Sequence, residues 1–247
     1  MNPPQAASPP HPVAAGPGNL LGPLLRGDTD YLLRWMALPV RPWIGSLACI
    51  VVGAGLYGAA VGLWRSPLQA VYSAVKLPLI LLLTATGNAL LNAVLAPLLG
   101  LAITLRQSLV CVLAGFAISA VFLGGIAPVL AFGTWSLPAL GADAGANRHA
   151  FYILQTTQVA AIAIAGFAGN ARLFQLLCRL APDRHVARRV ILAWLLGNFL
   201  LGTQAGWILR PYFGTPNLPV EFLRAHPLEG NFFESIGTAV RHLLAPE

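Results

Sequence analysis

The sequence predicts an all-α fold, a polytopic transmembrane helix bundle with five spanning helices and short interfacial helices. Of the 247 residues, 57% are hydrophobic and only 9% are charged, whereas a soluble domain carries about 25% charged residues. Several segments of twenty or more residues contain no Asp, Glu, Lys or Arg. About twenty apolar residues span the hydrocarbon core of a bilayer as a helix. The arginines lie between these segments, where basic residues set membrane topology.

The N-terminal region is expected to stay outside the bilayer. Residues 1–23 contain seven prolines and no charge, and proline lacks an amide hydrogen and fixes φ. We therefore expect residues 1–30 to form a disordered, proline-rich tail. Residues 31–42 are apolar but too short to span, so they predict an interfacial helix. The start of the chain lacks the basic residues and apolar run of a signal peptide, so insertion through the first spanning helix is expected.

Five spans make up the predicted transmembrane domain, residues 43–210. Their expected bounds are 43–64, 77–100, 108–130, 150–171 and 188–210. The first is flanked by Trp43 and Trp64, whose rings favour the level of the headgroups. The second must tilt, bend near Pro97 or end near Gly100, because its uncharged run of 29 residues would be about 44 Å long as a straight helix.

Two segments next to these spans allow further interpretation. Ser66-Pro67-Leu68-Gln69 predicts a capped helix start, and the short helix that follows, up to Lys76, is expected to lie along the membrane surface. The uncharged run 107–142 is too short for two full spans. It is expected to hold one helix and a loop, with a re-entrant turn between Gly124 and Pro138 as the alternative.

The last segment, residues 211–247, predicts an exoplasmic tail with a short amphipathic helix. It is polar, and Pro211, Pro216, Pro219 and Pro227 lie in its first half. Within 231–244 the apolar residues fall on one helical face. The segment also contributes aromatic side chains that must bury against lipid, helix ends or another protein.

Basic residues predict the orientation. With five spans, the side that carries the N-terminus holds nine basic residues and the opposite side holds six. Because basic loops favour the cytoplasm, we expect a protein of the cell inner membrane with a cytoplasmic N-terminus and a periplasmic C-terminus. The nine are Arg26, Arg34, Arg41, Arg106, Arg172, Arg179, Arg184, Arg188 and Arg189, and the six are Arg65, Lys76, Arg148, Arg210, Arg224 and Arg241.

The sequence argues against an enzyme. No ionisable residue lies in the core of a predicted span, whereas proton-coupled transporters and intramembrane hydrolases need such groups. No HExxH, phosphate-binding loop or CxxC motif occurs, and the five histidines lie outside the spans. No catalytic residue, cofactor or metal is therefore expected. Nucleic acid is not an expected partner either, because the cations do not cluster on a solvated face.

Neutral polar residues within the spans allow two interpretations. Their amides must face other helices or a wet cavity, because an unsatisfied amide is costly in hydrocarbon. The structural interpretation is interhelical hydrogen bonds, worth about 0.6 to 2 kcal/mol each. The functional one is a polar pathway for a small neutral solute, lined by Asn88, Asn92, Gln155 and Gln204. The full set is Asn88, Asn92, Gln155, Gln158, Asn198 and Gln204.

Two GxxxG patterns predict close helix packing. They are formed by Gly58 with Gly62 in the first span, and by Gly202 with Gly206 in the fifth. Missing side chains let backbones approach closely where lipid removes the hydrophobic drive. Leucine at Gly58 or Gly202 is expected to impair assembly. Candidate contacts with a partner or with lipid headgroups are Arg172, Arg179, Arg184, Arg188, Arg189, Trp207 and Arg210.

The order of parts resembles the bacterial members of the Yip1-like family. A proline-containing N-terminus precedes five spans, and residues 66–79, Ser-Pro-Leu-Gln-Ala-Val-Tyr-Ser-Ala-Val-Lys-Leu-Pro-Leu, resemble the region before the second span of such proteins. The likeness covers residues 43–210. It implies an integral membrane component without a known enzymatic activity that acts through protein partners. The segment after Leu209 matches no pattern of that family.

Two functional hypotheses follow. The first is a non-enzymatic inner-membrane scaffold, assembly factor or subunit of a larger membrane complex, with membrane lipids and other membrane subunits as partners. The second is a permease or channel component for a small neutral or lipidic solute. A continuous polar cavity touching Asn88, Gln155 and Gln204 would favour transport, and direct helix-to-helix bonds of these amides would favour the scaffold.

Overall fold

The computed structural model describes residues 41–137, 144–212 and 219–234. Five long α-helices account for most of these residues: α3 (Arg41–Gly62), α4 (Pro67–Leu98), α5 (Leu105–Ser136), α6 (Ala144–Leu180) and α7 (Arg184–Ile208). Each is long and apolar enough to cross a membrane. The predicted fold class, an all-helical bundle with five spanning helices, is confirmed, and the layout is that of a multi-pass membrane protein.

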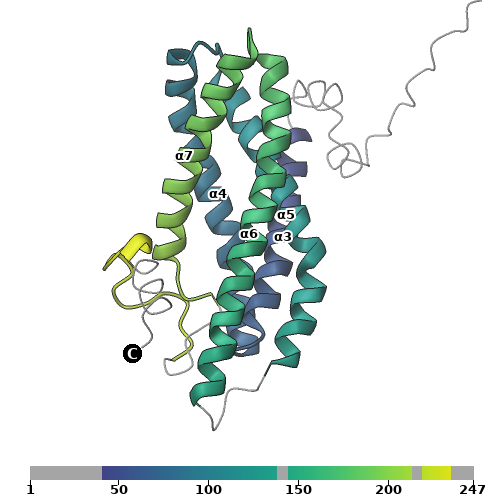
Figure 1. The fold of residues 1–247 in the computed structure, drawn as a ribbon, viewed down its shortest axis with the longest axis vertical. Coiled ribbons are helices and arrows are strands. Elements are labelled where there is room, and N and C mark those ends of the chain that lie inside the picture. The colour runs from purple at the N-terminus through teal and green to yellow at the C-terminus, as the bar shows by residue number, and fades with distance from the viewer. Residues whose placement is uncertain (1–40, 138–143, 213–218, 235–247) are drawn as a thin grey trace, which may run out of the picture.

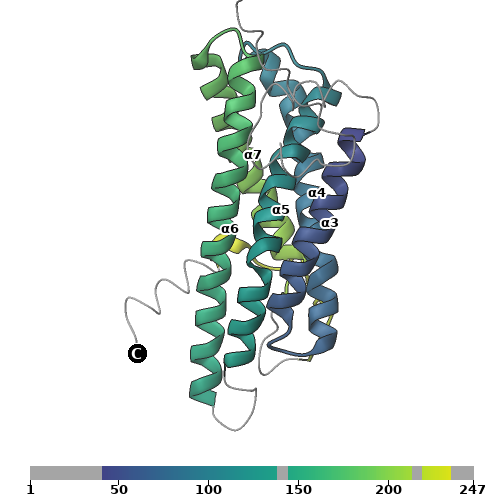
Figure 2. The same ribbon diagram turned by 90° about the vertical axis from the view of Figure 1, so that its right-hand side faces the viewer.

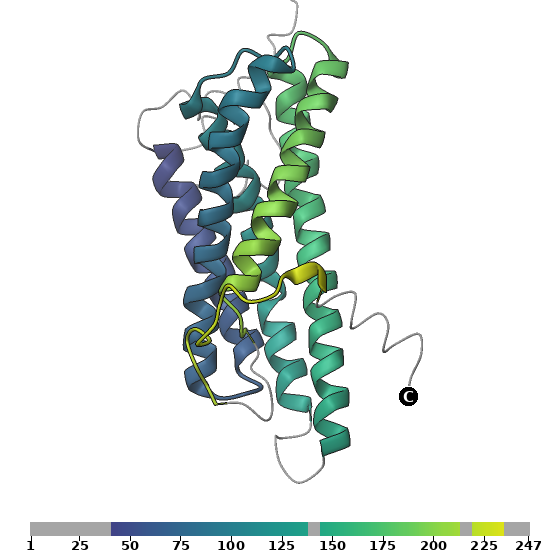
Figure 3. The ribbon, with the colours of Figure 1, turned by 90° about the vertical axis from the view of Figure 1, so that its left-hand side faces the viewer.

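The helices run alternately in opposite directions along one long axis (Figure 1). α3 packs against both α4 and α5, α6 lies against α5, and α7 lies against α4. Figures 2 and 3 show these five helices from the two sides. α6 and α7 are joined by the short turn 181–183, diverge from it, and contact each other far less than the other neighbouring helices do. The bundle is therefore open between α6 and α7.

The second span begins earlier than the sequence predicts. Ser66 caps α4 as expected, because its hydroxyl accepts from the amide of Gln69 at 3.1 Å. The helix then continues through Lys76 and Pro78 to Leu98. The separate surface helix ending at Lys76 is therefore a wrong prediction. The polar residues of this stretch find partners inside the bundle, so nothing requires them to lie at the surface.

The other helices are longer than expected at one end or both. α5 stays helical through Pro128 to Ser136, which excludes a re-entrant turn in the described part of 124–138. α6 extends from Ala144 to Leu180 rather than from 150 to 171. α7 begins at Arg184 because the Asp183 carboxylate accepts from the amides of His185 and Val186, at 2.7 and 2.9 Å. These bonds, that of Val186 foremost, hold the pKa of Asp183 below its ordinary value.

Three helix crossings depend on glycine. A Cβ on Gly58 would overlap the carbonyl of Ser73 where α3 meets α4, and one on Gly62 would lie 2.6 Å from the Cα of Ala70. A Cβ on Gly53 would overlap the carbonyl of Ala120 on α5. One on Gly169 of α6 would overlap the hydroxyl of Ser119 on α5. At these crossings α3 approaches α4 and α5, and α6 approaches α5, to backbone contact, which is how helices gain packing energy in lipid.

Several predicted segments lie outside the described residues. They are the tail 1–30, the interfacial helix 31–42 except for its last two residues, and the amphipathic helix beyond residue 234. Of the predicted stretch, the structure describes residues 231–234: the side chain of Asn231 accepts from the amide of Glu234 at 2.9 Å, and residues 232–234 are helical.

Gly58→Leu is expected to destabilise the bundle, because the new side chain would meet the backbone of α4 with no room to move. Overpacking of this kind costs about 1 to 3 kcal/mol. Thermal unfolding of the purified protein in detergent would measure it. The control is Gly125→Leu on α5, where a Cβ meets nothing within 4 Å; equal unfolding temperatures for the two variants would contradict the packing account.

Candidate functional site

A row of polar side chains on α4 binds the backbone that follows α7. Gln69, Ser73 and Lys76 recur at helical spacing and share one face of α4. The Gln69 amide donates to the carbonyls of Pro211 at 3.1 Å and Tyr212 at 2.8 Å. The Ser73 hydroxyl also donates to the carbonyl of Tyr212, and Lys76 Nζ donates to that of Pro211 at 2.9 Å. We call these three side chains the carbonyl clamp.

Lys76 is the ionisable group that the sequence interpretation misplaced. It is fully buried and lies nine residues beyond the start of α4, about 14 Å along the helix axis. Its ammonium also lies 5.0 Å from the centre of the Phe222 ring. The sequence places Lys76 just outside the predicted second span, 77–100, whereas the helix long enough to cross a membrane begins at Pro67 and includes it. The cation is tolerated because a carbonyl and an aromatic face replace its water.

Arg210 and Trp207 fasten the C-terminal segment to the end of α7. The Arg210 guanidinium donates to the carbonyls of Trp207, Pro227 and Glu229, at 2.7, 3.2 and 3.1 Å. It also stacks on the Trp207 ring at 3.8 Å, and Trp207 Nε1 donates to the carbonyl of Glu229 at 2.9 Å. Burial lowers the pKa of Arg210, and the nearby charge of Arg224 lowers it further. Trp207 and Arg210, which the sequence predicts as candidate contacts with a partner or with headgroups, thus bind the backbone of the C-terminal segment.

The main cavity is a cleft of about 1310 Å³ between α6 and α7, which we call the groove. All five helices contribute to it, with α3, α4 and α5 behind and α6 and α7 as walls. Most of the lining is apolar, and includes Phe116, Ile162 and Phe199. One end is lined by Arg184, His185 and Arg188, and the other by Arg210, Tyr212 and Arg224.

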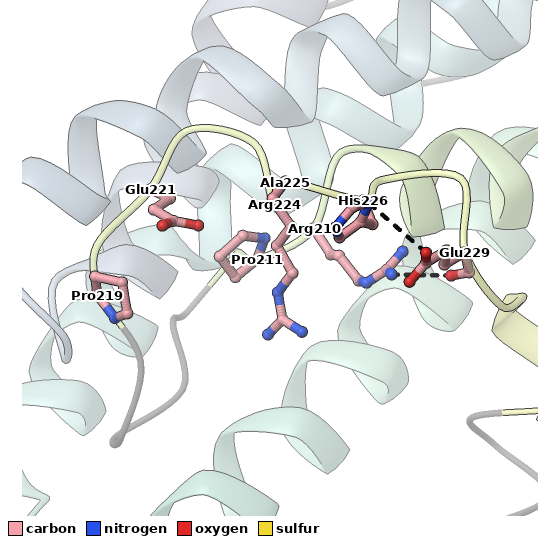
Figure 4. A pocket seen from close by; sticks show the side chains of 8 residues that line it. All are labelled: Arg210, Pro211, Pro219, Glu221, Arg224, Ala225, His226 and Glu229. Carbon is pink, nitrogen blue, oxygen red and sulfur yellow. Dashed lines mark hydrogen bonds and ion pairs between the residues drawn. The ribbon is translucent and has the colours of Figure 1, made fainter.

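A smaller cavity of about 290 Å³ adjoins the second end (Figure 4). It shares Arg210, Pro211 and Arg224 with the groove. His226 Nδ1 lies 3.6 Å from the Glu229 carboxylate. Figure 4 shows the guanidinium of Arg224 extending away from this pair. A cationic side chain therefore stands where the two cavities join.

Two buried hydroxyls line the groove without a protein partner. Tyr57 on α3 is fully buried and Thr84 on α4 is 3% exposed, and neither hydroxyl makes a hydrogen bond. Both residues line the groove. Buried polar atoms are normally paired, and an unpaired one costs about 1 to 3 kcal/mol. Both oxygens have almost no accessible surface, so they lie behind the wall of the groove and are not exposed to a group within it.

The predicted polar residues divide between the two interpretations. The Asn88 amide donates to the carbonyl of Trp194 at 3.2 Å and to the Asn198 side chain at 2.6 Å, which joins α4 to α7 directly. Asn92 is buried with neither polar atom paired. Gln155, Gln158 and Asn198 line the groove, whereas Gln204 is exposed outside it. A polar path through Asn88, Gln155 and Gln204 is therefore not assembled.

The glycines predicted to pack helices do not all have the same role, and the predicted basic residues do not all lie in one place. Gly58 and Gly62 face α4, but Gly202 and Gly206 line the groove, and a Cβ on Gly202 would make only an ordinary contact with Thr84 at 3.6 Å. Of the basic residues, Arg184, Arg188 and Arg210 line the groove, as does Trp207. Arg179 and Arg189 are exposed, and Arg172 donates to Gln175 at 3.1 Å.

Comparisons with protein-family models, curated proteins and solved structures give no match. The resemblance to the Yip1-like family therefore stays a prediction. Among the described residues, no group of three or more His, Cys, Asp or Glu side chains is arranged to hold a metal ion.

Sequence reasoning missed the residues that shape the site. The carbonyl clamp had a visible signal, because Gln69, Ser73 and Lys76 lie four and three residues apart. Assigning a surface helix to that stretch concealed it. Tyr57 and Thr84 carry no signal of their own, since one hydroxyl in a span is compatible with many roles.

Lys76→Met should loosen the C-terminal segment while leaving the helices formed. Without the ammonium the Pro211 carbonyl keeps only its bond from Gln69, and losing a charged hydrogen bond costs about 1.5 to 3 kcal/mol. Hydrogen exchange of residues 219–234 should accelerate. Lys76→Arg, which keeps a donor, serves as the control. Unchanged exchange in the Met variant would show that the clamp does not hold the segment.

Proposed function

We propose that this protein is a non-enzymatic inner-membrane protein that binds a membrane lipid in the groove between α6 and α7. The observation that carries the proposal is the groove itself, which is apolar along its length and cationic at its ends. This is the chemistry of an amphiphile with acyl chains and a charged headgroup. The proposal corresponds to the hypothesis of a permease component for a lipidic solute, rather than a small neutral one.

The size and the opening of the groove support a lipid. Pockets for drug-sized ligands are about 300 to 1,000 Å³, and the groove, at about 1310 Å³, is larger. It lies between two helices that diverge, so acyl chains would enter sideways from the bilayer (Figure 1). The apolar side chains of the lining favour such chains.

A second candidate, a subunit of a larger membrane complex, is favoured by the small residues of the groove walls. Gly166 on α6 and Gly202 and Gly206 on α7 line the groove, and a Cβ on Gly166 meets nothing within 4 Å. Small residues admit a closely packed helix. A helix from another protein would then occupy the groove in place of lipid, and the resemblance to the Yip1-like family implies action through protein partners.

A groove-filling variant separates these candidates. Gly166→Trp adds a large ring to the groove wall at a position where a Cβ meets nothing within 4 Å, so it should reduce co-purifying lipid at least fivefold in native mass spectrometry. Gly133→Trp on α5 is the matched control, because a Cβ there also meets nothing within 4 Å and the residue lies outside the groove.

Two outcomes would contradict lipid binding. If the wild-type protein carries no bound lipid after mild extraction from its native membrane, a lipid is excluded as the occupant of the groove. Loss of a stoichiometric protein partner from Gly166→Trp, with lipid content unchanged, would favour the complex subunit.

The proposed orientation places the turn between α6 and α7 in the cytoplasm and the C-terminal segment in the periplasm. In a background without Cys49, Cys111 and Cys178, cysteine at exposed Leu228 should react with an impermeant maleimide in intact cells. Cysteine at exposed Arg179 should react only after lysis. The reverse pattern would invert the topology and leave the groove unchanged.

A further inference from the structure

We infer that the groove holds an anionic phospholipid from one leaflet, whose phosphate is bound by Arg184 and Arg188 at the end where α6 turns into α7. The inference rests on the proposed lipid-binding function and deepens it by naming the headgroup and the end at which it binds. Three observations carry it: unpaired cations at this end, engaged cations and carboxylates at the other end, and an apolar wall one leaflet deep below the first.

Two guanidinium groups at the start of α7 have no partner in the protein. Arg184 and Arg188 are one helical turn apart, and both line the groove. Neither makes a hydrogen bond or an ion pair within the part of the chain that the structure describes. Guanidinium groups bind phosphate strongly because they present paired donors in a planar fork. The two side chains can therefore bind one phosphate from adjacent turns of the same helix.

No acidic side chain among the described residues lines the groove, so none repels a phosphate within it. The acidic residue nearest this end is Asp183, whose carboxylate accepts from the amides of His185 and Val186. The bond from Val186, and after it the charges of His185 and Arg189, lower the pKa of Asp183. Asp183 thus acts on the first amides of α7 and on these two cations, and the phosphate site consists of side chains rather than of the helix start.

The opposite end of the groove does not offer an equivalent site. Arg210 lies there, but its guanidinium already donates to three backbone carbonyls. Arg224 shares the smaller cavity with Glu221 and Glu229 (Figure 4), whose carboxylates would repel a phosphate. The polarity of the groove is therefore fixed, and an anionic headgroup binds at the end next to the α6–α7 turn.

The wall below the two arginines matches the depth of one leaflet. Arg188 and Asn198 are ten positions apart on α7, which corresponds to about 15 Å along a helix. The hydrocarbon core is about 30 Å thick, so this is the depth of one half of it. The groove-lining residues of α7 between these two positions are all apolar: Ile191, Leu192 and Leu195. A lipid held at the arginines would therefore lay its acyl chains against this wall within its own leaflet.

The test is a lipid titration of the delipidated full-length protein in mild detergent, measured by native mass spectrometry. The probes are phosphatidylglycerol and phosphatidylcholine with identical acyl chains. The wild-type protein should bind phosphatidylglycerol at least about tenfold more tightly than phosphatidylcholine. Arg184→Gln and Arg188→Gln should each weaken binding of phosphatidylglycerol about tenfold, since each removes a charge-assisted hydrogen bond. The affinities for the two lipids should then become similar.

Matched variants separate this site from a general effect of charge. Arg189→Gln neutralises the next residue of α7, which is exposed but does not line the groove, and should leave the preference unchanged. Arg179→Gln neutralises an exposed cation near the end of α6, also outside the groove, and should behave in the same way. Equal losses for Arg188→Gln and Arg189→Gln would show that net charge alone attracts the lipid, which would overturn the site.

Two further probes test the source of the phosphate and its position. Glycerol 3-phosphate in large excess should not displace phosphatidylglycerol, and displacement would make a soluble phosphate compound the ligand instead of a lipid. Phosphatidylglycerol with a photoreactive group on its headgroup should label peptides from residues 173–192. Labelling confined to residues 219–234 would place the headgroup at the opposite end and overturn the assigned polarity.

Failure of this inference is distinguishable from failure of the proposed function. Equal affinity of the wild-type protein for the two lipids would overturn the anionic headgroup and keep lipid binding. Absence of any bound lipid would remove the proposed function, and this inference with it.

Discussion

The structure depends on which side chains donate hydrogen bonds to the backbone carbonyls just after the end of α7. α7 stops at Ile208, and Figure 1 shows its end above the far ends of the neighbouring helices. The carbonyls of Pro211 and Tyr212 have no helical partner there, and a bare carbonyl in a poorly hydrated place is costly. Gln69, Ser73 and Lys76 of α4 supply the donors. These hydrogen bonds hold the end of α7 against α4 rather than against α6.

The groove follows from that tie. The direct bonds from Asn88 to the Trp194 carbonyl and to Asn198 hold the middle of α7 against α4. α6 is held separately, against α5, where Gly169 meets the hydroxyl of Ser119 and Ser119 donates to the carbonyl of Ala165 at 2.9 Å. Two helices that are adjacent in the chain are thus bound to different neighbours. The space between them, rather than a cluster of reactive side chains, is the feature that a ligand can use.

Much of the fold could be predicted from composition and charge spacing, because burial of apolar segments in lipid decides both. Long uncharged runs are direct evidence of spans, and Ser66 is a recognisable cap. Helix ends were less predictable: α4 includes Lys76 and α6 continues past Arg172. A charged residue ends a span only if nothing replaces its water, and the carbonyl and aromatic ring that do so for Lys76 lie more than 130 residues away.

The groove was beyond the reach of sequence reasoning for a related reason. A glycine in a span can face a neighbouring backbone, as Gly58 does, or an open space, as Gly166 does, and the sequence pattern is the same.

The most direct test of the arrangement of α7 is disulfide cross-linking in native membranes, in a background without the three native cysteines. A pair at Thr84 and Gly202, across the α4–α7 interface, should cross-link rapidly, while a pair at Ile162 and Leu195, on opposite walls of the groove, should not. Equally rapid cross-linking of both pairs would mean that α7 closes onto α6, which would contradict the account.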